Sequence, residues 1–171
     1  VALPLSTVSA AAVQIEGSLG VANVTAGDTD YDLNSVNATF DQVVKFQVYY
    51  HNMENPETGG TAENLTVKIN IPSAPGLVQT VSTTIKGDNT NTINDQVNVN
   101  LNRADAYIAY IPGSAVWKHN IGTNDAPNIV EEVVSDSIVT SGSGLNLEDE
   151  NPCFNFDATV TVLARVRVPA V

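Results

Sequence analysis

Hydrophobic and polar residues alternate with a period of two in four stretches of this chain. That spacing puts every second side chain on one face of an extended strand, as in a β-strand with one buried face. The clearest stretch is 64–71, which Pro72 ends by removing a backbone hydrogen-bond donor. The alternation predicts strands at 43–50, 64–71, 97–101 and 158–168.

Weaker alternation predicts four more strands, and glycine- and proline-rich turns separate them. Helical spacing is scarce, so we expect no more than a short turn near 103–106 or within 137–147. Many short strands with frequent turns predict an all-β fold, a single Ig-like or jelly-roll-like antiparallel β-sandwich. The weaker strands are expected at 19–25, 77–85, 106–111 and 129–134.

The first fifteen residues differ from the rest because they contain no charged side chain. An exposed strand normally carries charges that prevent unwanted pairing, so we expect this segment to be covered. It is either the first strand of its own sandwich or a donor strand that adds to the open sheet edge of a neighbouring copy. The second interpretation divides the chain into a donor strand at 1–15 and a sandwich domain at 16–171. Its predicted interface residues are Leu3, Leu5, Val8, Ala11, Val13 and Ile15.

Composition and charge favour a protein outside the cytoplasm. Charged residues make up 15% of the chain, and the net charge is −12, so nucleic acid and anionic lipid are unfavourable partners. The sequence begins at Val1 without a charged and then apolar leader, which predicts a mature chain after removal of a signal peptide, or a chain trimmed for expression. No apolar run is long enough to predict membrane insertion.

Several short motifs occur in the order of a known domain. Residues 41–52 read as a predicted strand followed by Asn52, and residues 62–72 as a predicted strand followed by Pro72. Residues 110–117 contain Pro-Gly-Ser, and 158–168 form a closing strand rich in valine. In this order the chain resembles the conserved-repeat β-sandwich domain of unknown function found in bacterial and archaeal surface proteins. The resemblance implies a cell-surface structural module and supplies no catalytic residues.

Catalytic motifs are weak. The two histidines, His51 and His119, are expected on the surface or in loops, and no nucleophile-elbow sequence accompanies the serines. Cys153 is the only cysteine, which excludes an internal disulfide, and we expect it to be a small buried residue. The sequence therefore predicts that the protein is not an enzyme.

One acidic motif is a candidate calcium site. Asp28, Asp30 and Asp32 have the alternating spacing of oxygen ligands that wrap one ion. Leu33 and Thr39 replace the glycine and glutamate that an EF-hand requires, so the alternatives are a looser calcium site or a solvated acidic loop. The acidic run 148–150 is expected to be a solvated turn. No other cofactor is predicted.

Three acceptor sequences for N-linked glycans are present, at Asn23, Asn37 and Asn64. Asn64 stands at the head of a predicted strand, where a glycan would be exposed.

These features together predict a structural subunit of an extracellular, pilus-like filament, a helical homopolymer of this chain with possible N-glycans. The alternative is a monomeric cell-surface, S-layer or adhesin-type binding module. Exposed aromatic side chains would form the binding surface of such a module, and the candidates are Tyr107, Tyr110 and Trp117.

Overall fold

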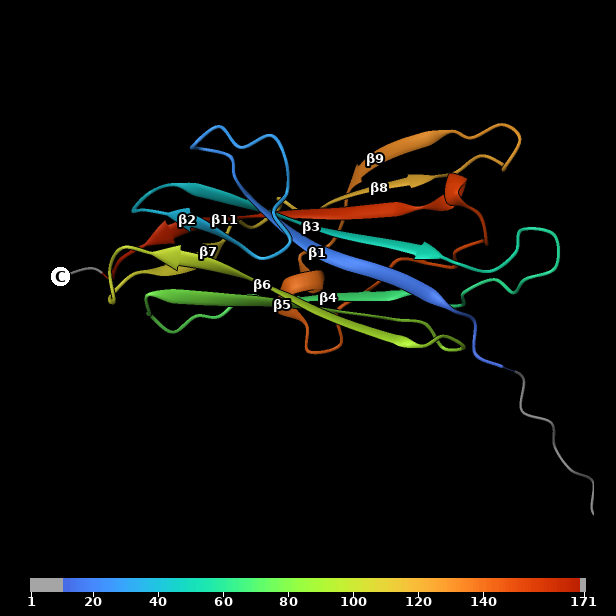
Figure 1. Ribbon diagram of the computed structural model, residues 1–171, viewed down its shortest axis with the longest axis horizontal. Coiled ribbons are helices and arrows are strands. Elements are labelled where there is room, and N and C mark those ends of the chain that lie inside the picture. Colours follow the sequence, from blue (N-terminus) through green and yellow to red (C-terminus); the bar gives the residue numbers. More distant parts are fainter. Residues whose placement is uncertain (1–10, 170–171) are drawn as a thin grey trace, which may run out of the picture.

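The computed structural model describes residues 11–169, which form two packed β-sheets (Figure 1). The first sheet is six-stranded, and every pairing in it is antiparallel. Its order is β1-β3-β11-β8-β9, and β7 also pairs with β11. The strands are β1 (Ile15–Asn23), β3 (Val43–Asn52), β7 (Tyr107–Tyr110), β8 (Val116–Asn120), β9 (Ile129–Val133) and β11 (Ala158–Arg167).

The second sheet is five-stranded, with the order β10-β4-β5-β6-β2. Only the pair β2–β6 is parallel among the described strands. Helical structure is limited to α1 (Ser137–Thr140) and the 3-10 turn η1 (Phe154–Phe156) in the described part of the chain. The strands of this sheet are β2 (Ser35–Ala38), β4 (Thr66–Asn70), β5 (Val78–Lys86), β6 (Thr92–Leu101) and β10 (Leu145–Asn146).

The core lies between the sheets and is formed by the apolar members of each alternating stretch. In β11, every second residue from Ala158 to Val166 is buried, and β3 pairs with it so that Phe46 lies opposite Val162. The second sheet supplies matching buried side chains, including Val67, Val81 and Val97. Each fully buried aliphatic side chain stabilises the fold by about 1.5–3 kcal/mol.

The prediction of an all-β sandwich is confirmed. Each strand predicted from alternation is present, with ends shifted by a few residues, and the helical turn expected within 137–147 is α1. Three strands, β2, β8 and the two-residue β10, were not predicted. None of the helices in residues 11–169 has the length and apolar character needed to cross a bilayer.

The start of β1 changes the expected boundary between tail and domain. Ile15 is 2% exposed and lies opposite Asn52 of β3, while Val13 is 8% exposed and forms a parallel bridge with Thr90. Both residues belong to the core of their own chain, so they are unavailable to a neighbour and the boundary moves to residue 12. Ala11 is exposed. The other predicted interface residues, Leu3, Leu5 and Val8, lie outside the described residues.

Candidate functional site

The outer edge of β1 is closed by side chains from the other sheet. The N–H group of Ile15 donates to Asn91 Oδ1 at 2.7 Å, and the amide of Asn91 donates back to the Ile15 carbonyl at 3.0 Å. Four residues along, the N–H group of Leu19 donates to Asp95 Oδ2 at 2.8 Å. These groups point away from β3, so without the two side chains they would be free to pair with another strand.

Beyond Leu19, the β1 edge is closed by the acidic loop that follows the strand. Val21 and Asp32 exchange two backbone hydrogen bonds of 2.9 Å, and the N–H group of Asn23 donates to Asp28 Oδ2 at 2.9 Å. The loop that resembles a calcium motif therefore protects a sheet edge.

The calcium prediction for Asp28, Asp30 and Asp32 stays a prediction, and their side-chain contacts give it no support. Within residues 11–169, no three acidic, histidine or cysteine side chains gather into a group that could hold a metal ion. Asp32 Oδ1 accepts hydrogen bonds from the N–H groups of Asn34 and Ser35, at 2.7 and 3.0 Å, and these bonds lower the pKa of Asp32. Asp28, Asp30 and Asp32 are all exposed and line one open hollow of the acidic loop.

The opposite edge of the same sheet, at β9, is bare (Figure 1). Next to the strand, the N–H group of Val134 donates to the Ala115 carbonyl at 3.0 Å, on the side of β8. Because successive N–H groups of a strand point in opposite directions, those of Ile129, Glu131 and Val133 point away from β8. Nothing in the described part of the chain pairs with this side of β9.

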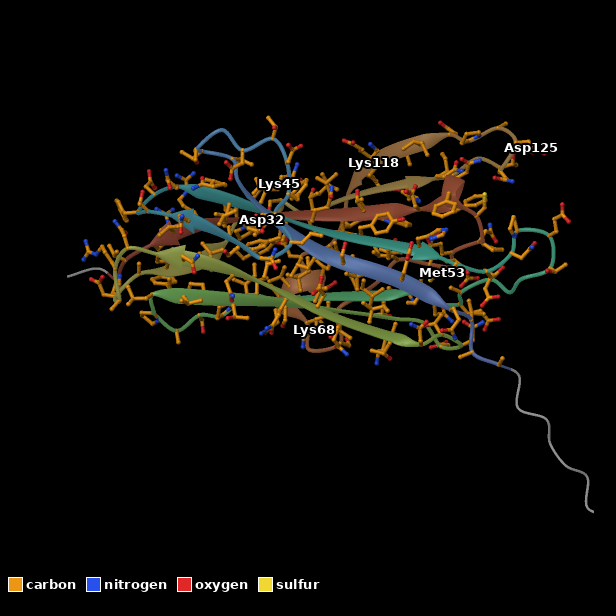
Figure 2. All side chains as sticks on the ribbon, viewed as in Figure 1. Asp32, Lys45, Met53, Lys68, Lys118 and Asp125 are labelled. Carbon is orange, nitrogen blue, oxygen red and sulfur yellow. The ribbon has the colours of Figure 1, made fainter. Side chains whose placement is uncertain are left out.

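Apolar side chains are exposed beside this bare edge. Ile129 is 49% exposed, Val133 69%, and Ile121, in the loop between β8 and β9, 58%. Glu131, which shares the face of Ile129 and Val133, lies opposite the exposed Lys118 of β8. Figure 2 labels Lys118. An unpaired edge flanked by exposed aliphatic side chains is suited to the addition of a strand.

A cluster of aromatic side chains lies on the inner face of β8. The indole Nε1 of Trp117 donates to the Tyr50 hydroxyl at 2.8 Å, and the ring of His119 stacks on the indole with centroids 3.3 Å apart. His119 Nε2 lies 2.6 Å from Glu132 Oε1 on the neighbouring strand. Trp117 is only 9% exposed, and His119 belongs to a strand, although the sequence predicts a surface or loop position for it.

The other candidate aromatic residues also pack against the domain. Tyr107 and Tyr110 are half-buried in β7, and the Tyr110 hydroxyl donates to Asp136 Oδ1 at 2.6 Å. Burial and this bond raise the pKa of Tyr110 to about 12. The three aromatic residues that the binding-module hypothesis names therefore do not form an exposed platform.

His51 is more buried than the sequence predicts, and Cys153 is less buried. His51 is 3% exposed in β3, where its ring stacks on Phe154 with centroids 4.2 Å apart and its Nδ1 lies 3.2 Å from Glu16 Oε1. Cys153 is half-buried, and its thiol donates to Asn124 Oδ1 at 2.8 Å. The thiol is hydrogen-bonded to an amide oxygen, and Cys153 lines one hollow with His51 and Glu16.

The three glycan acceptor sites differ sharply in exposure. Asn23 is 2% exposed, and its amide nitrogen donates to the Asn37 carbonyl at 2.8 Å and to Gln42 Oε1 at 2.9 Å. A glycan on that nitrogen would displace these hydrogen bonds, so the packing disfavours Asn23 as an acceptor. Asn37 and Asn64 are exposed, as a glycan requires.

Comparison with known proteins found no match to a family model, to a curated protein or to a solved structure. The resemblance to the conserved-repeat domain of surface proteins stays a prediction. Function is therefore argued from the two sheet edges, where sequence reasoning missed the capping residues Asn91 and Asp95. One feature of the sequence could have indicated the role of Asp95: it is a charged residue on the apolar face of an alternating stretch.

Proposed function

We propose that this chain is a structural subunit of an extracellular filament, in which residues 1–12 of one copy add as a strand to the β9 edge of the next copy. The observation that carries the proposal is the contrast between β1 and β9, two edge strands of the first sheet. The β1 edge is capped by Asn91, Asp95 and the acidic loop, whereas the β9 edge is unpaired beside exposed Ile129 and Val133.

The chemistry of residues 1–12 suits this edge. The segment has no charged side chain, so it can be covered without removing an ionised group from water. Its Leu3, Leu5 and Val8 would pack against the exposed aliphatic side chains at β9. The backbone hydrogen bonds would come from the outward N–H and C=O groups of β9.

The topology explains why such contacts would build a filament. The donor segment precedes β1, and the acceptor is β9, which is the strand at the other edge of the same sheet. A contact between two different surfaces of identical copies is head-to-tail, and it continues without closing unless the rotation happens to form a ring. Each copy would therefore give one strand and receive one.

Deletion of residues 1–12 tests the proposal while leaving Val13 and Ile15 in the core. We expect the full chain to form fibres in negative-stain electron microscopy and the deletion variant to elute as a monomer in size-exclusion chromatography with light scattering. A variant in which a Gly/Ser segment of equal length replaces residues 1–12 controls for length and should also be monomeric. Fibres from either variant would rule out donor-strand assembly.

The alternative is a monomeric cell-surface or adhesin-type module. It is favoured by the aromatic hollow that contains Trp117, His119 and Tyr50. In that case the full chain and the deletion variant would both be monomers at every concentration tested.

A further inference from the structure

Glu150 has a buried carboxyl group without a hydrogen-bond partner. The residue is 6% exposed, and neither Oε1 nor Oε2 has a partner among the described residues. The sequence predicts a solvated turn at 148–150, and for Glu150 that prediction is wrong. A buried, unpartnered carboxyl group is costly, so its position calls for a physical reason.

The backbone around Glu150 is firmly held, so a loose loop does not explain the inward side chain. Glu150 exchanges two backbone hydrogen bonds with Ala62, at 2.9 and 2.8 Å. Its carbonyl oxygen also accepts a 3.0 Å hydrogen bond from the side-chain amide of Asn52. Both Ala62 and Asn52 are fully buried.

A cavity of about 330 Å³ lies beside Glu150, between the inner face of β8 and the segment 147–151. The stacked rings of Trp117 and His119 form part of its wall, and the hydrogen bond from Trp117 to Tyr50 holds the indole in place. No lysine or arginine is among the described residues that line it. The cavity therefore combines aromatic walls with negative charge.

The titratable groups around Glu150 are mostly acidic. Burial, together with the negative charge of Asp157, raises the pKa of Glu150 to about 8. The backbone N–H group of Asn52 lowers this pKa slightly, although it does not form a hydrogen bond with the carboxyl group. Burial also raises the pKa of Tyr50 well above its usual value, so that its hydroxyl stays neutral. The titratable groups that face the cavity or interact with Glu150 are Tyr49 and Tyr50 from β3, His119 from β8, Asp157 after η1, and Glu148 and Asp149 from the same segment.

We propose that this cavity binds a small organic cation of the alkylammonium type. Both carboxyl oxygens of Glu150 are covered in this structure, so the side chain would rotate toward the cavity on binding and accept hydrogen bonds from the charged nitrogen. The alkyl part of the ligand would lie against the rings of Trp117 and His119. Aromatic faces attract organic cations, and the cavity volume is at the small end of the range for ligand sites. A metal ion fits less well, because the described residues offer no group of three ligands.

Binding would release a proton. The carboxyl group of Glu150 is protonated at pH 7 in the empty cavity, and pairing with an ammonium group favours the carboxylate, so the proton passes to solvent. The affinity for the cation should therefore increase about tenfold for each unit by which the pH rises toward about 8. Above about pH 8 the affinity should be constant.

Titration of the full chain with n-propylammonium chloride tests this proposal. Trp117 is the only tryptophan, so its fluorescence reports on the cavity directly. We expect a saturable fluorescence change that Glu150→Gln weakens at least about tenfold, the factor that corresponds to about 1.4 kcal/mol. Glu131→Gln, on the outer face of β9, should leave the affinity unchanged. Neutral n-propanol and matched concentrations of sodium chloride should give no saturable change.

Two further measurements check the folding of the variant and the release of the proton. Glutamine has the shape of the protonated acid, so Glu150→Gln should fold, and near-ultraviolet circular dichroism checks this. Calorimetry of the unaltered protein in two buffers of different ionisation enthalpy should give about one proton released per bound cation at pH 7. Binding without proton release, equal binding of n-propanol, or unchanged affinity in Glu150→Gln would each overturn the proposal. None of these results depends on filament formation.

Discussion

Asp95 of β6 accepts a 2.8 Å hydrogen bond from the backbone N–H group of Leu19 in β1, although the two strands belong to different sheets. The bond ties the edge of the first sheet to the inward face of the second. It also occupies a backbone group that another strand could use. One carboxylate therefore contributes to the stability of the sandwich and to the choice of the edge that stays open.

Asp95→Ala should destabilise the domain measurably. Removal of a charged acceptor leaves the part-buried N–H group of Leu19 unpaired, and we expect a loss of about 1.5–3 kcal/mol in the free energy of unfolding, measured in urea. Asp105→Ala is the control, because Asp105 forms an exposed pair with Arg103 and its loss should change stability by no more than about 0.5 kcal/mol. Equal effects of the two substitutions would contradict the capping role.

Stability should fall as the pH rises from about 5 to about 8, because of Glu150. Its pKa is raised from 4.5 to about 8 in the folded chain, so the folded state retains a proton that the unfolded state has lost. This contribution is complete below about pH 4.5 and is lost through pH 8, with a slope of at most about 1.4 kcal/mol per pH unit. Urea unfolding at a series of pH values measures it.

Glu150→Gln isolates that contribution, since its neutral amide does not titrate. The difference in unfolding free energy between the unaltered protein and Glu150→Gln should decline across the same pH window, while contributions from all other groups cancel. Asp136 has the opposite effect on stability: hydrogen bonds from Tyr110 and Gly113 lower its pKa, so its contribution to stability is lost as the pH falls. A difference that does not vary with pH would show that Glu150 is not buried as a neutral acid.

Glycosylation should discriminate among the three acceptor sites. In a host that modifies folded chains, glycopeptide mass spectrometry should find glycans at Asn64 or Asn37 and none at Asn23. Asn23→Ala should also cost at least about 1–3 kcal/mol, since it leaves the partners of the buried amide unpaired. Asn64→Ala, at an exposed position, is the control. A fully occupied Asn23 in the native protein would contradict the packing around β1.

The backbone of β9 can be tested separately from its side chains. Glu131→Pro removes an outward N–H group that makes no bond to β8, so it should leave the domain folded and prevent assembly. Glu131→Ala removes the same side chain but retains the N–H group, and it should still form fibres. Light scattering of both variants compares their assembly. If the two variants assemble equally well, β9 is not the acceptor edge.

The sandwich was predictable because its core residues repeat locally along the chain. In 64–71 and 158–168 the apolar side chains of each strand alternate, so the strand and its buried face can be read together. The four-residue strand β2 contains Ser35 and Asn37 and pairs in parallel with β6, so its position depends on a distant partner.

The contacts at the two edges and the buried acid depend on tertiary neighbours that no local pattern reports. Asn91 and Asp95 act on β1, more than seventy residues away in the chain. Glu150 belongs to an acidic run that is typical of a solvated turn. Its backbone hydrogen bonds with Ala62 hold it in the interior of the domain instead. Asp28 and Asp32 have the spacing of ion ligands, but backbone N–H groups take up their carboxylates instead.

Electron cryo-microscopy of the material formed by the full chain tests the central claim most directly. The account predicts a filament in which an extra strand, continuous with Val13 of one copy, is hydrogen-bonded to the outward edge of β9 in the next copy. A filament in which β9 has no added strand, or a preparation that contains only monomers, would contradict it.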